Sequence, residues 1–85
     1  MTMEKAYTIA KEHNLLPITN ISYYPLSENK NLHIQTLFTP GEYEGIDNVV
    51  YVDIEDDNGD CIETDTIMYG DIEGLTLSIY ELCNR

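Results

Sequence analysis

Two strand-like segments on either side of Asp57-Asn58-Gly59 constrain the fold of this chain more than any other feature. Residues 49–56 and 60–69 are rich in β-branched and aromatic side chains, and Asn-Gly between two such segments is typical of a β-hairpin turn. In a three-residue loop at 57–59, Gly59 takes the left-handed conformation that a bulged turn requires. The sequence therefore predicts an antiparallel hairpin from Val49 to Tyr69.

The register of this hairpin follows from the rule that directly opposed residues share a face. A two-residue loop would place Ile54 opposite Glu63, an apolar residue and a charged one on the same face. The three-residue loop instead pairs Ile54 with Ile62, which gives one apolar side, and it pairs the carboxylates of Asp53 and Glu63 on the other side. The remaining predicted pairs are Val52 with Thr64, Val50 with Thr66, and Tyr51 with Asp65.

Helices are predicted at both ends of the chain. Thr2 is a candidate N-cap for the first helix, and Tyr7 is expected to lie in the core. Asp71 is a candidate N-cap for a second helix over residues 71–85. Apolar residues at 75, 77 and 79 also alternate as in a strand, but the stripe of apolar residues at helical spacing favours the helix.

Two further strands are predicted between the first helix and the hairpin. Residues 21–27 are rich in strand-forming residues, and Pro25 indicates an edge strand because proline cannot donate to a ladder. A turn at 27–31 leads to alternating apolar and polar residues at 32–39. The fold class expected is α+β: one domain over residues 1–85, with a small antiparallel sheet of three to four strands and both helices packed on one face.

The charge of the chain is distributed unevenly. The net charge is −12, and thirteen of the sixteen carboxylates lie between Lys30 and Arg85, a stretch that holds no Lys or Arg. Such a chain repels itself, and like charges paired across a ladder destabilise it further, so a strongly basic partner is the simplest reason for the pattern. The predicted partner-binding residues are Glu42, Glu44, Asp47, Tyr51, Asp53, Glu55, Asp56, Asp57, Asp60, Glu63 and Asp65.

Composition excludes several classes of protein. Cys61 and Cys83 form no Cys-x-x-Cys motif, so we expect no zinc site, no disulfide, and a cytosolic protein. No apolar run approaches the roughly 20 residues that cross a bilayer, and the negative charge argues against direct binding of nucleic acid or anionic lipid. We expect no cofactor.

The acidic turn does not match a known metal or catalytic motif. With Gly59 at the sixth position of a calcium loop, Ile54 falls where a carboxylate is required. A glycosidase would need one acid in an apolar cleft, for which an 85-residue chain has little room. His13 and His33 are expected to lie on the surface. The sequence thus predicts no catalytic residues, no metal ligands and no enzymatic activity.

Carboxylates at every second position of a strand are about 6.7 Å apart, close to the roughly 6.8 Å between every second phosphate of a nucleic-acid strand. In size, charge and layout the chain resembles the small acidic DNA-mimic proteins of phages and mobile elements, including anti-CRISPR and anti-restriction proteins. The resemblance implies an inhibitor, monomer or dimer, that blocks the DNA-binding groove of a CRISPR effector or another nuclease in the host cytosol. The alternative is a protein-interaction module or accessory subunit whose acids serve solubility.

Overall fold

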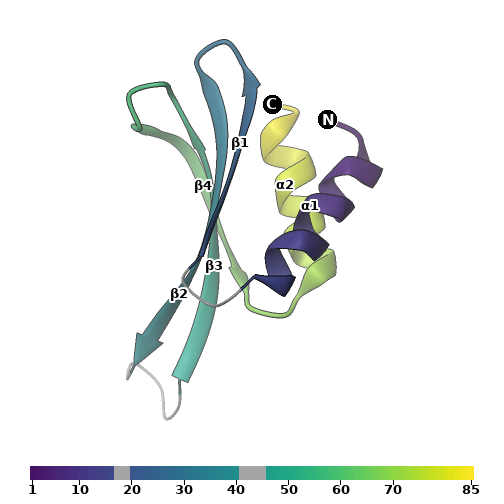
Figure 1. Ribbon diagram of the computed structural model, residues 1–85, viewed down its shortest axis with the longest axis vertical. Coiled ribbons are helices and arrows are strands. Elements are labelled where there is room, and N and C mark those ends of the chain that lie inside the picture. Colours follow the sequence, from purple (N-terminus) through teal and green to yellow (C-terminus); the bar gives the residue numbers. More distant parts are fainter. Residues whose placement is uncertain (17–19, 41–45) are drawn as a thin grey trace.

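Two helices cover one face of a four-stranded antiparallel sheet (Figure 1). The computed structural model describes residues 1–16, 20–40 and 46–85, with the backbone alone at 38–40 and 46–47. The strands follow one another as a meander in the order β1-β2-β3-β4, which confirms the predicted α+β layout. In chain order the elements are α1 (Met3–Leu15), β1 (Ile21–Ser27), β2 (Lys30–Pro40), β3 (Ile46–Glu55), β4 (Cys61–Met68) and α2 (Ile72–Cys83).

Side-chain caps begin both helices where the sequence predicts them. The hydroxyl of Thr2 accepts a hydrogen bond from the backbone N–H of Lys5, and the Asp71 carboxylate accepts one from Gly74 N–H, at 3.1 and 3.0 Å. Each cap satisfies one donor that the first turn of a helix leaves free. A Cβ on Gly74 would collide with the Asp71 carboxylate, so this glycine makes room for the cap. The helical prediction for the last segment is confirmed.

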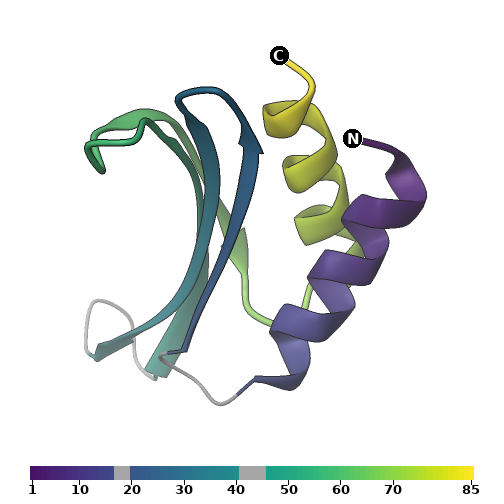
Figure 2. The ribbon, with the colours of Figure 1, turned by 45° about the horizontal axis from the view of Figure 1, so that its top comes forward.

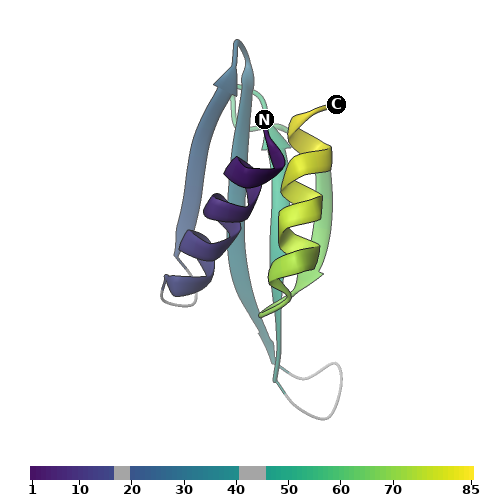
Figure 3. The ribbon, with the colours of Figure 1, turned by 90° about the vertical axis from the view of Figure 1, so that its right-hand side faces the viewer.

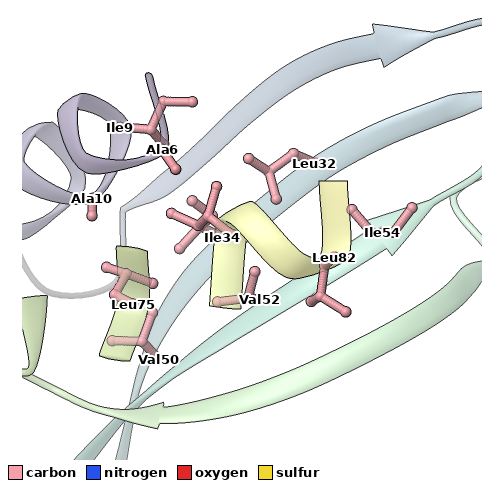
Figure 4. Close-up of a cluster of buried hydrophobic side chains, with 11 residues drawn as sticks. Ala6, Ile9, Ala10, Leu32, Ile34, Val50, Val52, Ile54, Leu75 and Leu82 are labelled. Atoms are coloured by element: carbon pink, nitrogen blue, oxygen red, sulfur yellow. The ribbon is translucent and has the colours of Figure 1, made fainter. Parts of the chain in front are cut away.

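The core lies between the helices and the inner face of the sheet (Figures 3 and 4). Leu32 and Ile34 of β2 and Val52 of β3 are fully buried, and Ile9 of α1 and Ile79 of α2 pack onto them. Their alternation along the strands matches the predicted inward faces of β2 and β3. Burying each such side chain contributes about 1.5–3 kcal/mol, which makes this layer the main source of stability in a small domain.

The prediction for the polar and aromatic residues of α1 is wrong at two positions. Tyr7 was expected in the core but is 48% exposed, whereas His13 was expected on the surface but is buried. The buried face of α1 comprises Ala6, Ile9, Ala10 and His13, at the spacing i, i+3, i+4 and i+7. His13 therefore continues the apolar stripe, and Tyr7 lies beside it.

The predicted register of the β3–β4 hairpin is also wrong. Ile54 lies opposite Glu63, and Asp53 lies opposite Thr64, so the two carboxylates expected to face each other do not. The register changes by one residue near the turn, where Glu55 pairs with Cys61. The remaining observed pairs are Val52 with Asp65, Tyr51 with Thr66, Val50 with Ile67 and Val49 with Met68.

The change of register arises beyond the hairpin turn, at a bulge where Ile62 is the additional residue of β4. The Asp56 carboxylate accepts hydrogen bonds at 2.9 Å from the backbone N–H groups of both Asn58 and Asp60, and Asp56 N–H donates to the Asp60 carbonyl. The two backbone bonds, Asp56 N–H to the Asp60 carbonyl and Gly59 N–H to the Asp56 carbonyl, pair Asp56 with Asp60 and confirm the predicted three-residue loop at 57–59. Gly59 has a φ of 85°, the left-handed conformation that the sequence predicted. The additional residue on β4 is accommodated as a bulge, which shifts the register along the rest of the strand.

The β1–β2 turn and the β3–β4 turn lie at the same end of the molecule as the two chain termini (Figure 2). The turn after β1 holds Asn29 with a φ of 61°, and the Asn29 side-chain oxygen accepts a hydrogen bond of 3.0 Å from Asp57 N–H. Asn31 donates from its side chain to the Asp57 carboxylate, also at 3.0 Å. The two turns are therefore joined, and Asp57 is fixed in the structure as well as exposed.

Candidate partner-binding face

The face of the sheet that points away from the helices forms a surface of its own, which we call the open face. Its side chains are those that alternate with the buried ones, so each lies beside its partner across the ladder. No described segment packs over this face (Figures 1 and 2). From β1 to β4 the open face comprises Ile21, Tyr23, His33, Gln35, Leu37, Val49, Tyr51, Asp53, Glu55, Thr64, Thr66 and Met68.

Large apolar and aromatic side chains are exposed on the open face. Ile21 and Tyr23 on β1 are each 52% exposed, and Met68 on β4 is 58% exposed. Leu37 on β2 is also exposed. Contiguous exposed apolar groups rimmed by polar ones are typical of protein-interaction sites, and the sequence analysis did not find this patch. The alternation of apolar and polar residues predicts which side chains share a face of the sheet, including these outward ones. It does not by itself predict which face the helices cover.

Two of the predicted partner-binding carboxylates lie on the open face. Asp53 and Glu55 project from the end of β3 nearest the turn, and the Asp53 carboxylate accepts a hydrogen bond of 2.5 Å from the Thr64 hydroxyl. Their side chains are 20% and 19% exposed because neighbouring strands flank them. Tyr51 precedes them on the same face and is half-buried.

Two other predicted carboxylates lie on the opposite side of the sheet. Glu63 accepts a hydrogen bond of 3.2 Å from the Arg85 guanidinium, and Asp65 accepts one of 2.8 Å from the Ser78 hydroxyl of α2. Both contacts link the edge strand β4 to the C-terminal helix or the residues after it. The single anionic face expected from the sequence is therefore divided between the two faces of the sheet.

The other predicted residues lie at the turn or outside the described side chains. Asp56, Asp57 and Asp60 form the hairpin turn, where Asp60 is exposed and Asp56 is occupied by backbone donors. Glu42 and Glu44 fall outside the described residues. Asp47 lies at the other end of β3 from Glu55, eight residues away, which corresponds to about 27 Å along a strand. The predicted set therefore does not converge on one point.

All four basic side chains lie on the helical side of the molecule. Lys11 packs over the Tyr7 ring of α1, with its Nζ 5.3 Å from the ring centroid. Lys30 donates to the Arg85 carbonyl at 3.3 Å, and Lys5 lines the same hollow as these two residues. The open face therefore holds carboxylates and no Lys or Arg, and it differs in charge from the helical side.

A buried polar network lies beneath the helices. His13 is hydrogen-bonded through Nδ1 to the Ser22 hydroxyl at 2.6 Å and through Nε2 to the Thr36 hydroxyl at 3.0 Å. Burial lowers the pKa of His13, which keeps the ring neutral near pH 7. Because all three side chains are enclosed, we assign this network a structural role.

Comparison with known proteins adds no relative to this description: no protein family, no curated protein and no solved structure matches the chain. Within the described residues, neither helix has the length and apolar character needed to cross a bilayer.

Proposed function

We propose that this protein has no catalytic role and binds a basic partner protein through the open face and the adjoining hairpin turn. The observation that carries this proposal is the separation of charge across the sheet. Every Lys and Arg lies on the helical side, whereas the open face combines carboxylates, tyrosines and exposed apolar side chains. A folded chain with a net charge of −12 carries self-repulsion that a basic partner would relieve.

The two parts of this surface would make different contributions to binding. Burial of Ile21, Leu37 and Met68 would supply affinity, at about 25 cal/mol for each Å² removed from water. The carboxylates would accelerate association and exclude acidic proteins. Tyr23, which is half-exposed beside them, suits stacking against arginine.

A nucleic-acid-binding protein is the partner we favour, with a CRISPR effector or another cytosolic nuclease as examples. Asp53 and Glu55 are two residues apart on β3, a spacing of about 6.7 Å that is close to that of alternate phosphates. Asp57 and Asp60 extend the negative charge into the turn. This row is shorter than the sequence predicted, since Glu63 and Asp65 face the helices, and competition with nucleic acid would centre on the turn end of the sheet.

The second candidate is an accessory module that binds mainly through its apolar side chains. The exposed Met68 and Leu37, which lie away from the carboxylates, favour it. Such a module would bind with little dependence on ionic strength, because burial of apolar surface is not screened by salt. Salt dependence therefore separates the two candidates.

The test is capture of partners by the tagged protein from a nuclease-treated lysate of the producing cells, followed by elution with rising salt or with duplex DNA. Capture alone decides nothing. We expect at least one captured protein to be basic and to be released both by moderate salt and by duplex DNA. Captured proteins that resist both treatments would contradict competition with nucleic acid and would support the accessory module.

A further inference from the structure

Three side chains with metal-binding chemistry meet on the open face. His33 on β2 lies directly opposite Asp53 on β3, and Glu55 follows two residues later on the same side. His33 Nδ1 is 3.6 Å from Asp53 Oδ2 and 3.7 Å from Glu55 Oε2. One ligand atom from each residue lies within 4.8 Å of the other two. The sheet therefore brings an imidazole and two carboxylates to one point.

The imidazole nitrogen at this point has no hydrogen-bond partner. His33 Nδ1 is a buried atom, and both carboxylate oxygens lie beyond the roughly 3.2 Å limit of an N–H···O hydrogen bond. Unpaired buried polar atoms are rare in folded proteins, and a bound ion is one recognised cause. The nitrogen is nearly equidistant from one oxygen of each carboxylate.

The two carboxylates have no Lys or Arg side chain to neutralise them, and His33 is the basic side chain beside them. Asp53 and Glu55 are both about four-fifths buried, and all Lys and Arg side chains lie on the other side of the sheet. Two carboxylates at this depth repel each other unless a cation lies between them. A cation bound among the three side chains would both satisfy the unpaired His33 nitrogen and offset the charge of the two carboxylates.

We propose that His33, Asp53 and Glu55 bind one divalent transition-metal ion, of which Zn²⁺ is the representative. An imidazole with two carboxylates suits zinc better than calcium or magnesium, which prefer oxygen ligands alone. Ligands of a tetrahedral zinc ion are roughly 3.3 Å apart, given bond lengths near 2.0–2.1 Å. The observed separations from His33 are a few tenths of an ångström wider, so small side-chain rotations would close the site.

The surroundings favour this assignment. The Thr64 hydroxyl donates to Asp53 and orients that carboxylate, as partners of metal ligands commonly do. Three protein ligands leave a fourth position, which is open to solvent or to a partner's side chain. Cys61 pairs with Glu55 across the ladder, but its thiol donates to the Glu63 carbonyl at 3.3 Å, so we do not count it as a ligand.

Calorimetric titration of chelator-treated protein with zinc chloride near neutral pH tests the proposal without any partner. We expect one ion per chain, and we expect His33→Gln, Asp53→Asn and Glu55→Gln each to weaken binding by about tenfold or more. Glu81→Gln removes the same charge from an exposed position on α2 and should leave the affinity unchanged. Repeating the titration in Cys61→Ser, which removes the exposed thiol, should give the same affinity.

Nitrogen chemical shifts of the two imidazoles give a second, structural readout. Zinc should shift Nδ1 of His33 and leave the ring of His13, which is buried elsewhere, unaffected. The proposal is overturned if zinc binding survives His33→Gln, if it disappears in Cys61→Ser, or if magnesium competes equally at several weak sites. These outcomes leave the proposed partner binding unaffected, because they concern the isolated chain.

Discussion

Truncating His13 to alanine should destabilise the protein more than any change to its surface. The imidazole is hydrogen-bonded to Ser22 and Thr36, which are 6% and 2% exposed. Its loss leaves two buried hydroxyl groups unpaired, at about 1–3 kcal/mol each, and the better helix propensity of alanine returns about 0.5 kcal/mol. We expect a net loss of about 1.5–5.5 kcal/mol, a large part of the roughly 4–13 kcal/mol typical of a domain this size.

The measurement is urea denaturation followed by circular dichroism, with thermal unfolding as a second probe. The melting temperature should fall by about 6–44 °C for that loss. The control carries His13→Leu, Ser22→Ala and Thr36→Val together. This variant removes all three polar groups, so none of them is left buried without a hydrogen-bond partner. Because apolar groups of similar shape replace all three partners, this triple variant should be more stable than His13→Ala.

Two results would refute the reasoning on His13. If His13→Ala unfolds within about 0.5 kcal/mol of the parent protein, the network does not hold the helix to the sheet, since changes that small are typical of surface positions. If the triple variant is less stable than His13→Ala, the cost arises from lost volume and not from unpaired hydroxyl groups.

Three further predictions concern pH, a helix cap and an ion pair. Because the pKa of His13 is lowered in the folded state, the unfolded chain binds a proton first, so the free energy of unfolding should fall as pH is lowered below about 6.5, and His13→Leu should flatten this dependence. Gly74→Ala should stabilise an Asp71→Ala variant by about 1 kcal/mol, because alanine favours the helix more than glycine does. The same change should not stabilise the parent protein, because the new Cβ displaces the capping Asp71 carboxylate. An equal gain in the free energy of unfolding in both proteins would contradict this. Glu63→Gln, which breaks the exposed pair with Arg85, should cost less than about 1 kcal/mol in the same assay.

The order of elements was predictable because each local pattern favours one type of element over the other, even in the last segment, where both patterns are present. Leu32, Ile34 and Thr36 alternate with polar residues and are all buried, as expected for the inner face of β2. Thr2 and Asp71 are side-chain acceptors just before apolar stripes, and both cap helices. These signals depend on neighbouring residues only, so they do not require knowledge of the tertiary structure.

The register of β4 was not predictable from the pairing rule, because the rule assumed that charged residues avoid the inner face. Glu63 and Asp65 lie on the edge strand, where their carboxylates reach Arg85 and Ser78 at the margin of the core. The bulge at Ile62, which shifts the register of β4 by one residue, also has no clear signature in the sequence.

The cluster at His33 was missed for a related reason. His33 and Asp53 are twenty residues apart and meet only because β2 and β3 pair in one particular register. Metal-binding motifs are recognised by the spacing of their ligands along the chain, and the spacing of these residues does not match any such motif. By contrast, the burial of His13 could have been read from its position four residues after Ile9 on the apolar stripe of α1.

The most direct test of the account is the same substitution placed on each side of the molecule. Thr66 lies on the open face and Thr8 on α1, and both are exposed. Thr66→Lys and Thr8→Lys change the net charge equally, and melting curves would check that both variants fold. The account predicts that Thr66→Lys weakens binding of the captured basic partner by about tenfold or more, since it sets like charges against each other, while Thr8→Lys has no effect. Equal loss from both variants would mean that net charge alone drives binding, and no loss from Thr66→Lys would mean that the open face is not the docking surface.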